Sequence, residues 1–101
     1  MPVVNDPAYA EKQKGVVFIE FYTDDCGPCK LMAPKMKKLE EEFTDVWFCY
    51  AHVQLHSASA AKYGVRGFPT FVLRKDGRIL EIFSGSQSIA RMREKLTAAV
   101  A

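Results

Sequence analysis

The chain has 101 residues, 49% of them hydrophobic and 26% charged, which is the composition of one soluble globular domain with its own core. Fourteen basic residues against twelve acidic ones leave a net charge of +2, too small and too evenly spread to predict binding to nucleic acid. No apolar run approaches the roughly 20 residues of a membrane-spanning helix, so we expect no membrane contact.

The N-terminus and the cysteine count indicate the compartment. Residues 1–6 contain neither the basic region nor the apolar region of a secretion signal. Three cysteines are an odd number and too few for a disulfide scaffold, which is typical of a reducing compartment. We therefore expect a single domain spanning residues 1–101, cytoplasmic and monomeric.

The first quarter of the chain predicts a short helix and a buried strand. Residues 2–4 favour a brief extended piece. A helix is expected from Asp6-Pro7, an N-cap followed by proline, to about Lys14. Residues 16–22 are apolar on both alternating faces except at Glu20, which predicts a central strand covered on both sides.

The middle of the chain predicts a long helix, a second strand and a short helix. The long helix starts at Cys29, and we expect Pro34 to kink it without ending it. Its apolar stripe consists of Met32, Met36, Leu39 and Phe43. Residues 46–53 indicate a second buried strand, and residues 57–63 a short helix that Gly64 stops.

The last third predicts a hairpin and a closing helix. Strands are expected at residues 70–74 and 78–83, joined by Lys75-Asp76-Gly77 with glycine where φ must be positive. A closing helix is expected from residue 86 to about residue 99, where the stripe Ile89, Met92, Leu96 and Val100 marks its apolar face. The order β-α-β-α-β-α-β-β-α predicts an α/β fold with one mixed central sheet and helices on both faces.

Cys26 and Cys29 are three residues apart at the point where the 16–22 strand gives way to the long helix. A cysteine at a helix start faces unpaired backbone N–H groups and the positive end of the helix dipole. Both favour the thiolate, which is the nucleophile in disulfide exchange. The placement therefore predicts a redox-active pair.

Two other interpretations of the cysteines remain open. Cys26 and Cys29 could be structural, or they could bind zinc together with Cys49 and His52, which have zinc-like spacing. Against zinc, positions three apart in a strand point to opposite faces of the sheet. We expect no metal and no bound cofactor, and predict that Cys49 is a small buried hydrophobe.

Several further motifs accompany the cysteine pair. They are Cys26-Gly27-Pro28-Cys29-Lys30, Ala33-Pro34, residues 63–70 (Tyr-Gly-Val-Arg-Gly-Phe-Pro-Thr), the Lys75-Asp76-Gly77 turn and Gly85. With them the chain resembles the thioredoxin family over nearly its whole length. The resemblance implies the thioredoxin fold, a thiol-disulfide oxidoreductase activity, protein disulfides as substrates and an electron donor of the thioredoxin reductase type.

The resemblance also implies the roles of the site residues. Cys26 is the exposed nucleophile that attacks a substrate disulfide, and Cys29 is the more buried resolving thiol that attacks the resulting mixed disulfide. Pro69 is cis and lies against the cysteine pair. The substrate-docking surface consists of Gly27, Pro28, Gly67, Phe68, Pro69 and Gly85.

Glu20 occupies the place where the family has a buried aspartate that relays a proton to or from the resolving cysteine. The same role is expected for Glu20, with a raised pKa because it is buried. The family's lysine partner falls at Tyr50, which supplies no cation. The open alternative is a carboxyl group that is merely satisfied by a tyrosine hydroxyl or by water.

The main departure from the family is at position 25, where thioredoxins nearly always have tryptophan and this chain has Asp25, preceded by Asp24. The only tryptophan, Trp47, is predicted in the core. The two carboxylates and Lys30 are expected to modulate the charge around Cys26. The sequence therefore predicts a general protein-disulfide reductase. The alternatives are a redox protein for one partner, or a non-catalytic adaptor binding through the Phe68-Pro69 surface.

Overall fold

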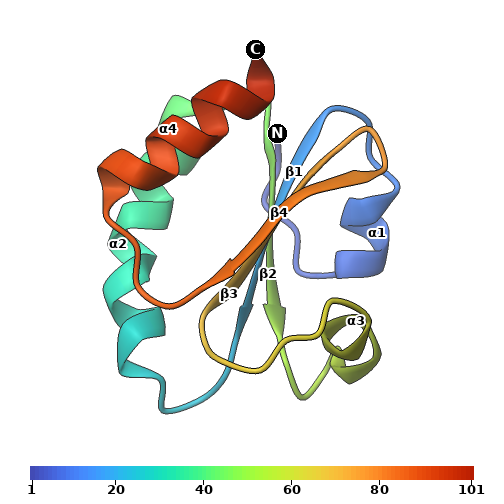
Figure 1. Ribbon diagram of the computed structural model, residues 1–101, viewed down its shortest axis with the longest axis vertical. Helices are drawn as coiled ribbons and strands as arrows, with labels where there is room; N and C mark the ends of the chain where they lie inside the picture. Colours follow the sequence, from blue (N-terminus) through green and yellow to red (C-terminus); the bar gives the residue numbers. More distant parts are fainter.

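The computed structural model describes residues 1–101 as four helices and a four-stranded sheet (Figure 1). In chain order the elements are α1 (Pro7–Glu11), β1 (Val16–Tyr22), α2 (Gly27–Glu42), β2 (Trp47–His52), α3 (Ser57–Lys62), β3 (Thr70–Lys75), β4 (Arg78–Ser84) and α4 (Ile89–Val100). None of the helices is both long and apolar enough to span a membrane.

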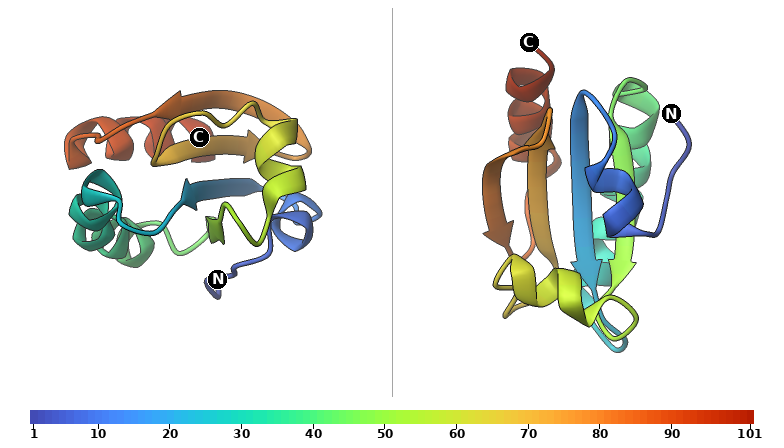
Figure 2. Two further views of the ribbon diagram at one scale, coloured as in Figure 1. Left: turned by 90° about the horizontal axis from the view of Figure 1, so that it is seen from below. Right: turned by 90° about the vertical axis from the view of Figure 1, so that its right-hand side faces the viewer.

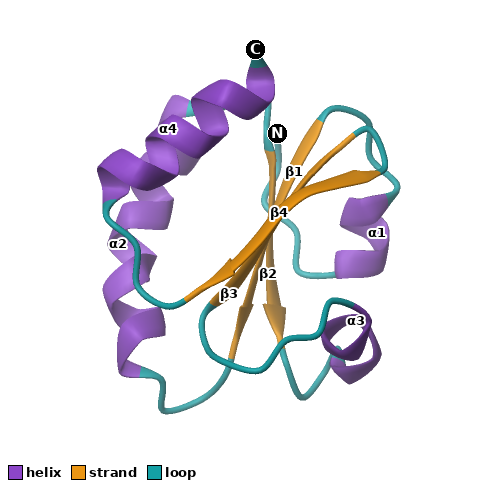
Figure 3. Ribbon diagram, viewed as in Figure 1, coloured by secondary structure: helices purple, strands orange, loops and turns teal.

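The sheet has the strand order β2-β1-β3-β4, with β1 parallel to β2 and antiparallel to β3, and β3 antiparallel to β4. Helices α2 and α4 lie on one side of the sheet, and α1 and α3 lie on the other (Figures 1 and 3). The expected mixed sheet with helices on both faces is confirmed. The central strand β1 contributes Phe18 to the α2/α4 face and Ile19 to the α1/α3 face, both with no exposed surface.

The expected first strand is reduced to a single bridge. Val4 donates its N–H to the Phe48 carbonyl and accepts from the Tyr50 N–H, which joins it to the outer edge of β2. Pro2 has no N–H to extend this pairing, and Asp6 already accepts the Ala8 N–H as the N-cap of α1. The N-terminal segment therefore runs along the sheet beside β2 without becoming a strand (Figure 2).

Several helix boundaries differ from the expected ones. Helix α4 begins at Ile89, three residues after the expected start, because Ser88 caps it by accepting the Arg91 N–H. Helix α1 ends at Glu11 rather than near Lys14, because the Lys12 N–H turns back to the Tyr9 carbonyl and the chain then bends towards Gly15, whose φ is 82°. Helix α2 begins at Gly27, two residues before the expected start, because Cys26 caps it. It continues through Pro34 to Glu42, as the apolar stripe predicts.

The β3–β4 hairpin closes through a two-residue turn. Asp76 has a φ of 49° and Gly77 a φ of 83°, which is the pair of positive values that the right-handed twist of the flanking strands favours. The Asp76 carboxylate also accepts the Gly15 N–H at 2.8 Å. The hairpin is thereby held against the turn that leads into β1.

Two residues expected in the core lie nearer the surface. Trp47 is only partly buried, because it begins the edge strand β2, and it packs edge-on against the exposed Tyr9 of α1. Val100 is 44% exposed at the end of α4, where the buried position is taken by Ala99. The rest of the α4 stripe packs as expected, with Met92 and Leu96 fully buried.

The two ends of the α4 stripe should therefore respond differently to truncation. Leu96→Ala is expected to lower the free energy of unfolding by about 2–5 kcal/mol, because it leaves a cavity in the core. Val100→Ala should change that free energy by less than about 0.5 kcal/mol. Urea denaturation of both variants checks this, and similar losses in both would place Val100 in the core.

Candidate active site

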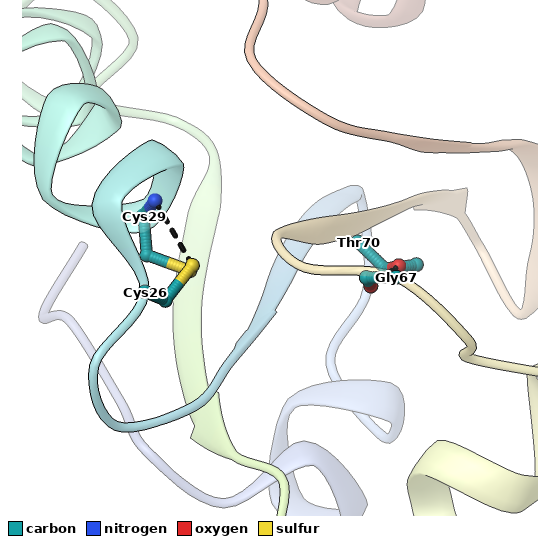
Figure 4. Close-up of a disulfide and its surroundings, with 4 residues drawn as sticks. All are labelled: Cys26, Cys29, Gly67 and Thr70. Carbon is teal, nitrogen blue, oxygen red and sulfur yellow. Dashed lines mark hydrogen bonds between the residues drawn. A yellow bond between two sulfur atoms is a disulfide. The ribbon is translucent and has the colours of Figure 1, made fainter.

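The cysteine pair lies at the junction between the end of β1 and the start of α2. After Tyr22 the chain turns through Asp25, whose φ of 54° is a conformation that aspartate tolerates better than most residues. Cys26 follows in an extended conformation as the N-cap of α2, and its Sγ accepts the Cys29 N–H at 3.2 Å (Figure 4). Cys26 and Cys29 form a disulfide, with their Cα atoms 5.3 Å apart.

The exposure of the two cysteines is the reverse of what the sequence led us to expect. Cys26 is buried, with 8% of its surface exposed, whereas Cys29 is partly exposed. The reason is local. The Cys26 sulfur folds back over the first turn of α2 to accept the Cys29 N–H. Cys29 lies on the flank of α2, where it lines a pocket.

Glu20 is buried in β1, directly opposite Tyr50 of β2, and is only 4% exposed. Its carboxyl group has no hydrogen-bond partner in the protein, and burial raises its pKa from 4.5 to about 7. The prediction of a buried Glu20 with a raised pKa is confirmed. The alternative in which a tyrosine hydroxyl satisfies it does not hold for Tyr50, which donates its hydrogen bond to Glu40 of α2 instead.

A pocket of about 340 Å³ joins these residues. It lies between α2 and the β1–β2 half of the sheet and is lined by Glu20, Tyr22, Cys29, Ala33, Met36, Lys37, Glu40 and Tyr50. Burial and the hydrogen bond to Glu40 raise the pKa of the Tyr50 hydroxyl far above its usual range, so this group remains a donor at any physiological pH. The pocket thus connects the buried acid and Cys29 to the surface of the molecule.

Four of the expected docking residues, Gly67, Phe68, Pro69 and Gly85, occupy two loops, whereas Gly27 and Pro28 are exposed in the first turn of α2. The Phe68-Pro69 bond is cis, and Pro69 is buried, while Gly67 is exposed. The Gly85 N–H donates to the Pro69 carbonyl at 2.8 Å, which ties the end of β4 to this loop. Thr70, whose hydroxyl donates to the Gly67 carbonyl at 2.6 Å, pairs with Phe21 of β1. The loop therefore lies at the end of β1 that leads to Cys26 (Figure 4).

Of the two acidic residues before Cys26, one is held in place. His52 Nδ1 accepts the Gln54 N–H, so the hydrogen of the neutral ring is on Nε2, which lies 3.1 Å from an Asp24 carboxylate oxygen. The His52 ring also packs edge-on against Tyr22. Sequence reasoning considered His52 only as a metal ligand and missed this contact, although the alignment of the ends of β1 and β2 could have indicated it.

Cys49 is separated from the cysteine pair by the sheet. It is fully buried on the α1/α3 face, and burial, with smaller contributions from Asp6 and Glu11, raises the pKa of its thiol to about 12. Its prediction as a small buried hydrophobe is confirmed. No three of the histidine, cysteine, aspartate and glutamate side chains are grouped so that they could hold a metal ion.

The comparisons with known proteins agree with this geometry. The thioredoxin family model matches residues 4–98. Thioredoxin-T of Drosophila melanogaster is 41% identical over 83 residues, which are 79% of this chain and 53% of that protein. The thioredoxin of Chlamydia caviae is 41% identical over 64 residues, 63% of each chain. The chain thus spans less than two thirds of the length of these two relatives.

Solved structures are similar over a larger share of both chains. The X-ray structure of Fasciola hepatica thioredoxin has a TM-score of 0.84 at 35% identity, covering 98% of this chain and 99% of that one. A mutant thioredoxin from Halobacterium salinarum has a TM-score of 0.87 at 31% identity, covering 98% of this chain and 89% of that one.

The unpartnered Glu20 should make stability depend on pH. Its pKa is higher in the folded state than in the unfolded one, so the folded protein binds more protons between pH 4.5 and 7 and loses stability as pH rises through that range. The free energy of unfolding is lowered by about 3 kcal/mol in this way, and the loss is complete above pH 7. Glu20→Gln should remove this dependence. Denaturation of both proteins from pH 4 to 8 measures it, and parallel curves would show that Glu20 has an ordinary pKa.

Proposed function

The chain belongs to the thioredoxin family, and on this premise we propose that it is a protein-disulfide reductase. In this proposal it cycles Cys26 and Cys29 between dithiol and disulfide. The observation that supports it most directly is the position of Cys26, whose sulfur accepts an amide hydrogen bond at the N-terminus of α2. The same hydrogen bond and the helix dipole stabilise a negative charge on that sulfur.

In the proposed first step, the Cys26 thiolate attacks one sulfur of a substrate disulfide. A bond forms between Cys26 and that sulfur, the substrate disulfide breaks, and the other substrate sulfur leaves as a thiolate that takes a proton from solvent. Since Cys26 is largely buried beside α2, the substrate has to approach in an extended conformation. The exposed Gly27 and Gly67 allow such a close approach of another backbone.

In the proposed second step, Cys29 loses its proton to Glu20, through water, and attacks Cys26. The Cys26–Cys29 disulfide forms, and the substrate leaves as its second thiolate, fully reduced. The step is intramolecular, so it competes well with escape of the trapped intermediate. A pKa of about 7 suits Glu20 to this transfer, because a proton acceptor works best when its pKa is near the working pH.

Asp24 and Asp25, the two carboxylates that precede Cys26, affect which substrates are used. Asp24 is held by His52, and Asp25 is exposed in the turn before Cys26, so both present negative charge where a substrate would approach. Lys30, exposed in the first turn of α2, opposes them only in part. The arrangement favours disulfides flanked by basic residues.

The Gly-Pro pair between the cysteines resembles the reducing members of the superfamily, which supports reduction as the physiological direction. We propose a thioredoxin reductase-type electron donor, a monomeric state and a cytoplasmic location. The rivals are a reductase dedicated to one partner and a non-catalytic adaptor. Reduction of insulin with dithiothreitol as electron source separates them, since general catalysis supports the main proposal and the lack of catalysis supports a rival.

The order of attack by the two cysteines can be tested with single-cysteine variants. Cys29→Ser should accumulate mixed disulfides with protein substrates, because Cys26 still attacks and nothing resolves the product. Cys26→Ser should accumulate none with protein substrates. Non-reducing electrophoresis followed by mass spectrometry detects these species, and the opposite pattern would assign the nucleophile to Cys29.

The variant Asp25→Asn tests whether the negative charge next to Cys26 acts on the site. A carboxylate about 7 Å from a thiolate costs roughly 0.6 kcal/mol in water-like dielectric, so removing it should lower the pH at which Cys26 ionises by roughly 0.4 units. The preference for basic over acidic peptide disulfides should narrow as well. The pH profile of iodoacetamide alkylation and paired peptide substrates measure the two effects. If neither changes, Asp25 does not act on the site.

A further inference from the structure

The loop between β4 and α4, residues 85–88, is held against α2 by Gln87. The Gln87 N–H donates to the Met32 sulfur at 3.4 Å, and the Gln87 carbonyl accepts from the Lys35 ammonium group at 2.9 Å. Met32 is fully buried on α2, three residues after Cys29, and Lys35 follows three residues later. Gln87 therefore determines how the loop lies beside the helix that carries the cysteine pair.

The Gln87 side chain also fixes the conformation of the loop. Its amide group donates to the carbonyls of Ser84 and Gly85, at 3.3 Å each. Gly85 has a φ of 88°, a value that glycine adopts more readily than other residues, and the chain leaves β4 at this point. Because both carbonyls accept from one amide group, the turn out of β4 depends on the Gln87 side chain.

The other side of this loop contacts the loop before β3. The Gly85 N–H donates to the Pro69 carbonyl at 2.8 Å, and the hydroxyl groups of Ser84 and Thr70 lie 2.8 Å apart. A continuous set of hydrogen bonds thus runs from α2 through Gln87 to the cis-proline loop. The spacing between α2 and both docking loops is set by these contacts.

We propose that Gln87 and Lys35 are positioning residues for protein substrates. They hold Gly85 and the loop before β3 at the distance from α2 at which an extended substrate segment can dock. The inference rests on the proposed function, because it takes these loops to be the place where a protein disulfide binds. Since their hydrogen bonds go to the loop and not to the cysteine sulfurs, Gln87 and Lys35 affect docking and not the chemistry of Cys26.

The contact with Lys35 can be removed without removing the packing of α2. A hydrogen bond from an ammonium group to a carbonyl is charge-assisted and stronger than a neutral one. Lys35 is partly buried, whereas Lys38 on the same helix is exposed and forms no hydrogen bond. The helix packs on the sheet through Met32, Met36 and Leu39. Loss of the Lys35 ammonium group should therefore release the loop without unfolding the domain.

The experiment compares a substrate that needs the docking loops with one that does not. Insulin is reduced with dithiothreitol as electron source, and the pre-reduced protein is separately mixed with 2-hydroxyethyl disulfide. Lys35→Met and Gln87→Met keep the length of each side chain but remove its hydrogen-bond donor. Each should raise KM for insulin roughly fivefold, as for the loss of one hydrogen bond. We expect kcat for insulin and the rate with 2-hydroxyethyl disulfide to stay unchanged.

Two further variants separate the hydrogen bond from the charge. Lys38→Met removes the same charge from an exposed site on α2 and should keep the wild-type KM. Lys35→Arg keeps a charged donor and should also recover that KM. Lys35→Met tests the inference even if Gln87→Met does not fold.

Two results would contradict the inference while wild-type insulin reduction is intact. One is an unchanged insulin KM in Lys35→Met, and the other is an equal loss of rate with insulin and with 2-hydroxyethyl disulfide. The second result would mean that these residues act on the cysteines themselves. If the wild-type protein does not reduce insulin, the proposed function fails and the inference fails with it.

Discussion

The hydrogen bond from the Cys29 amide to the Cys26 sulfur is the contact on which the site depends. It forms because β1 is packed on both faces and paired on both edges. The position of β1 fixes the turn after Tyr22, and that turn places Cys26 at the start of α2. The same contact caps the helix, buries Cys26 and provides a donor for a negative charge on its sulfur. The capping of α2 and the asymmetry between the two cysteines thus share one origin.

Two carboxyl groups act against a negative charge on Cys26, and a third, Glu20, acts against one on Cys29. Glu20 is buried below the pocket without a partner, Asp24 is fixed by His52, and Asp25 is exposed next to Cys26. A strongly oxidising disulfide arises where the protein stabilises the reduced form, chiefly as a thiolate. The carboxyl groups here have the opposite effect, since they make the thiolate less stable than uncharged neighbours would. Physical chemistry therefore favours a stable disulfide and a dithiol that gives up its electrons readily.

Most of the fold could be predicted from the sequence, because its elements carry strong local signals. The apolar run of β1 and the stripe Met32, Met36 and Leu39 of α2 correspond to buried positions. The same holds for Glu20, whose burial follows from its place within the apolar strand. The reversed exposure of Cys26 and Cys29 follows from the local hydrogen bond between them, and Val100 is exposed because Ala99 takes the buried position at the end of α4. The other failures depend on contacts distant in the chain. The single Val4 bridge and the partial burial of Trp47 are decided by what lies beside the edge strand β2. The Tyr50–Glu40 and His52–Asp24 contacts likewise join different elements, and no local sequence pattern marks them.

The reduction potential of the Cys26–Cys29 pair tests the central claim most directly, because it reports how far the protein stabilises the dithiol against the disulfide. Equilibration with dithiothreitol redox buffers, followed by alkylation and mass spectrometry, gives this value. A weakly stabilised thiolate in acidic surroundings predicts a potential of about −270 mV or below, as in reducing members of the superfamily. A potential above about −180 mV, in the range of protein disulfide isomerase and stronger oxidants, would contradict it.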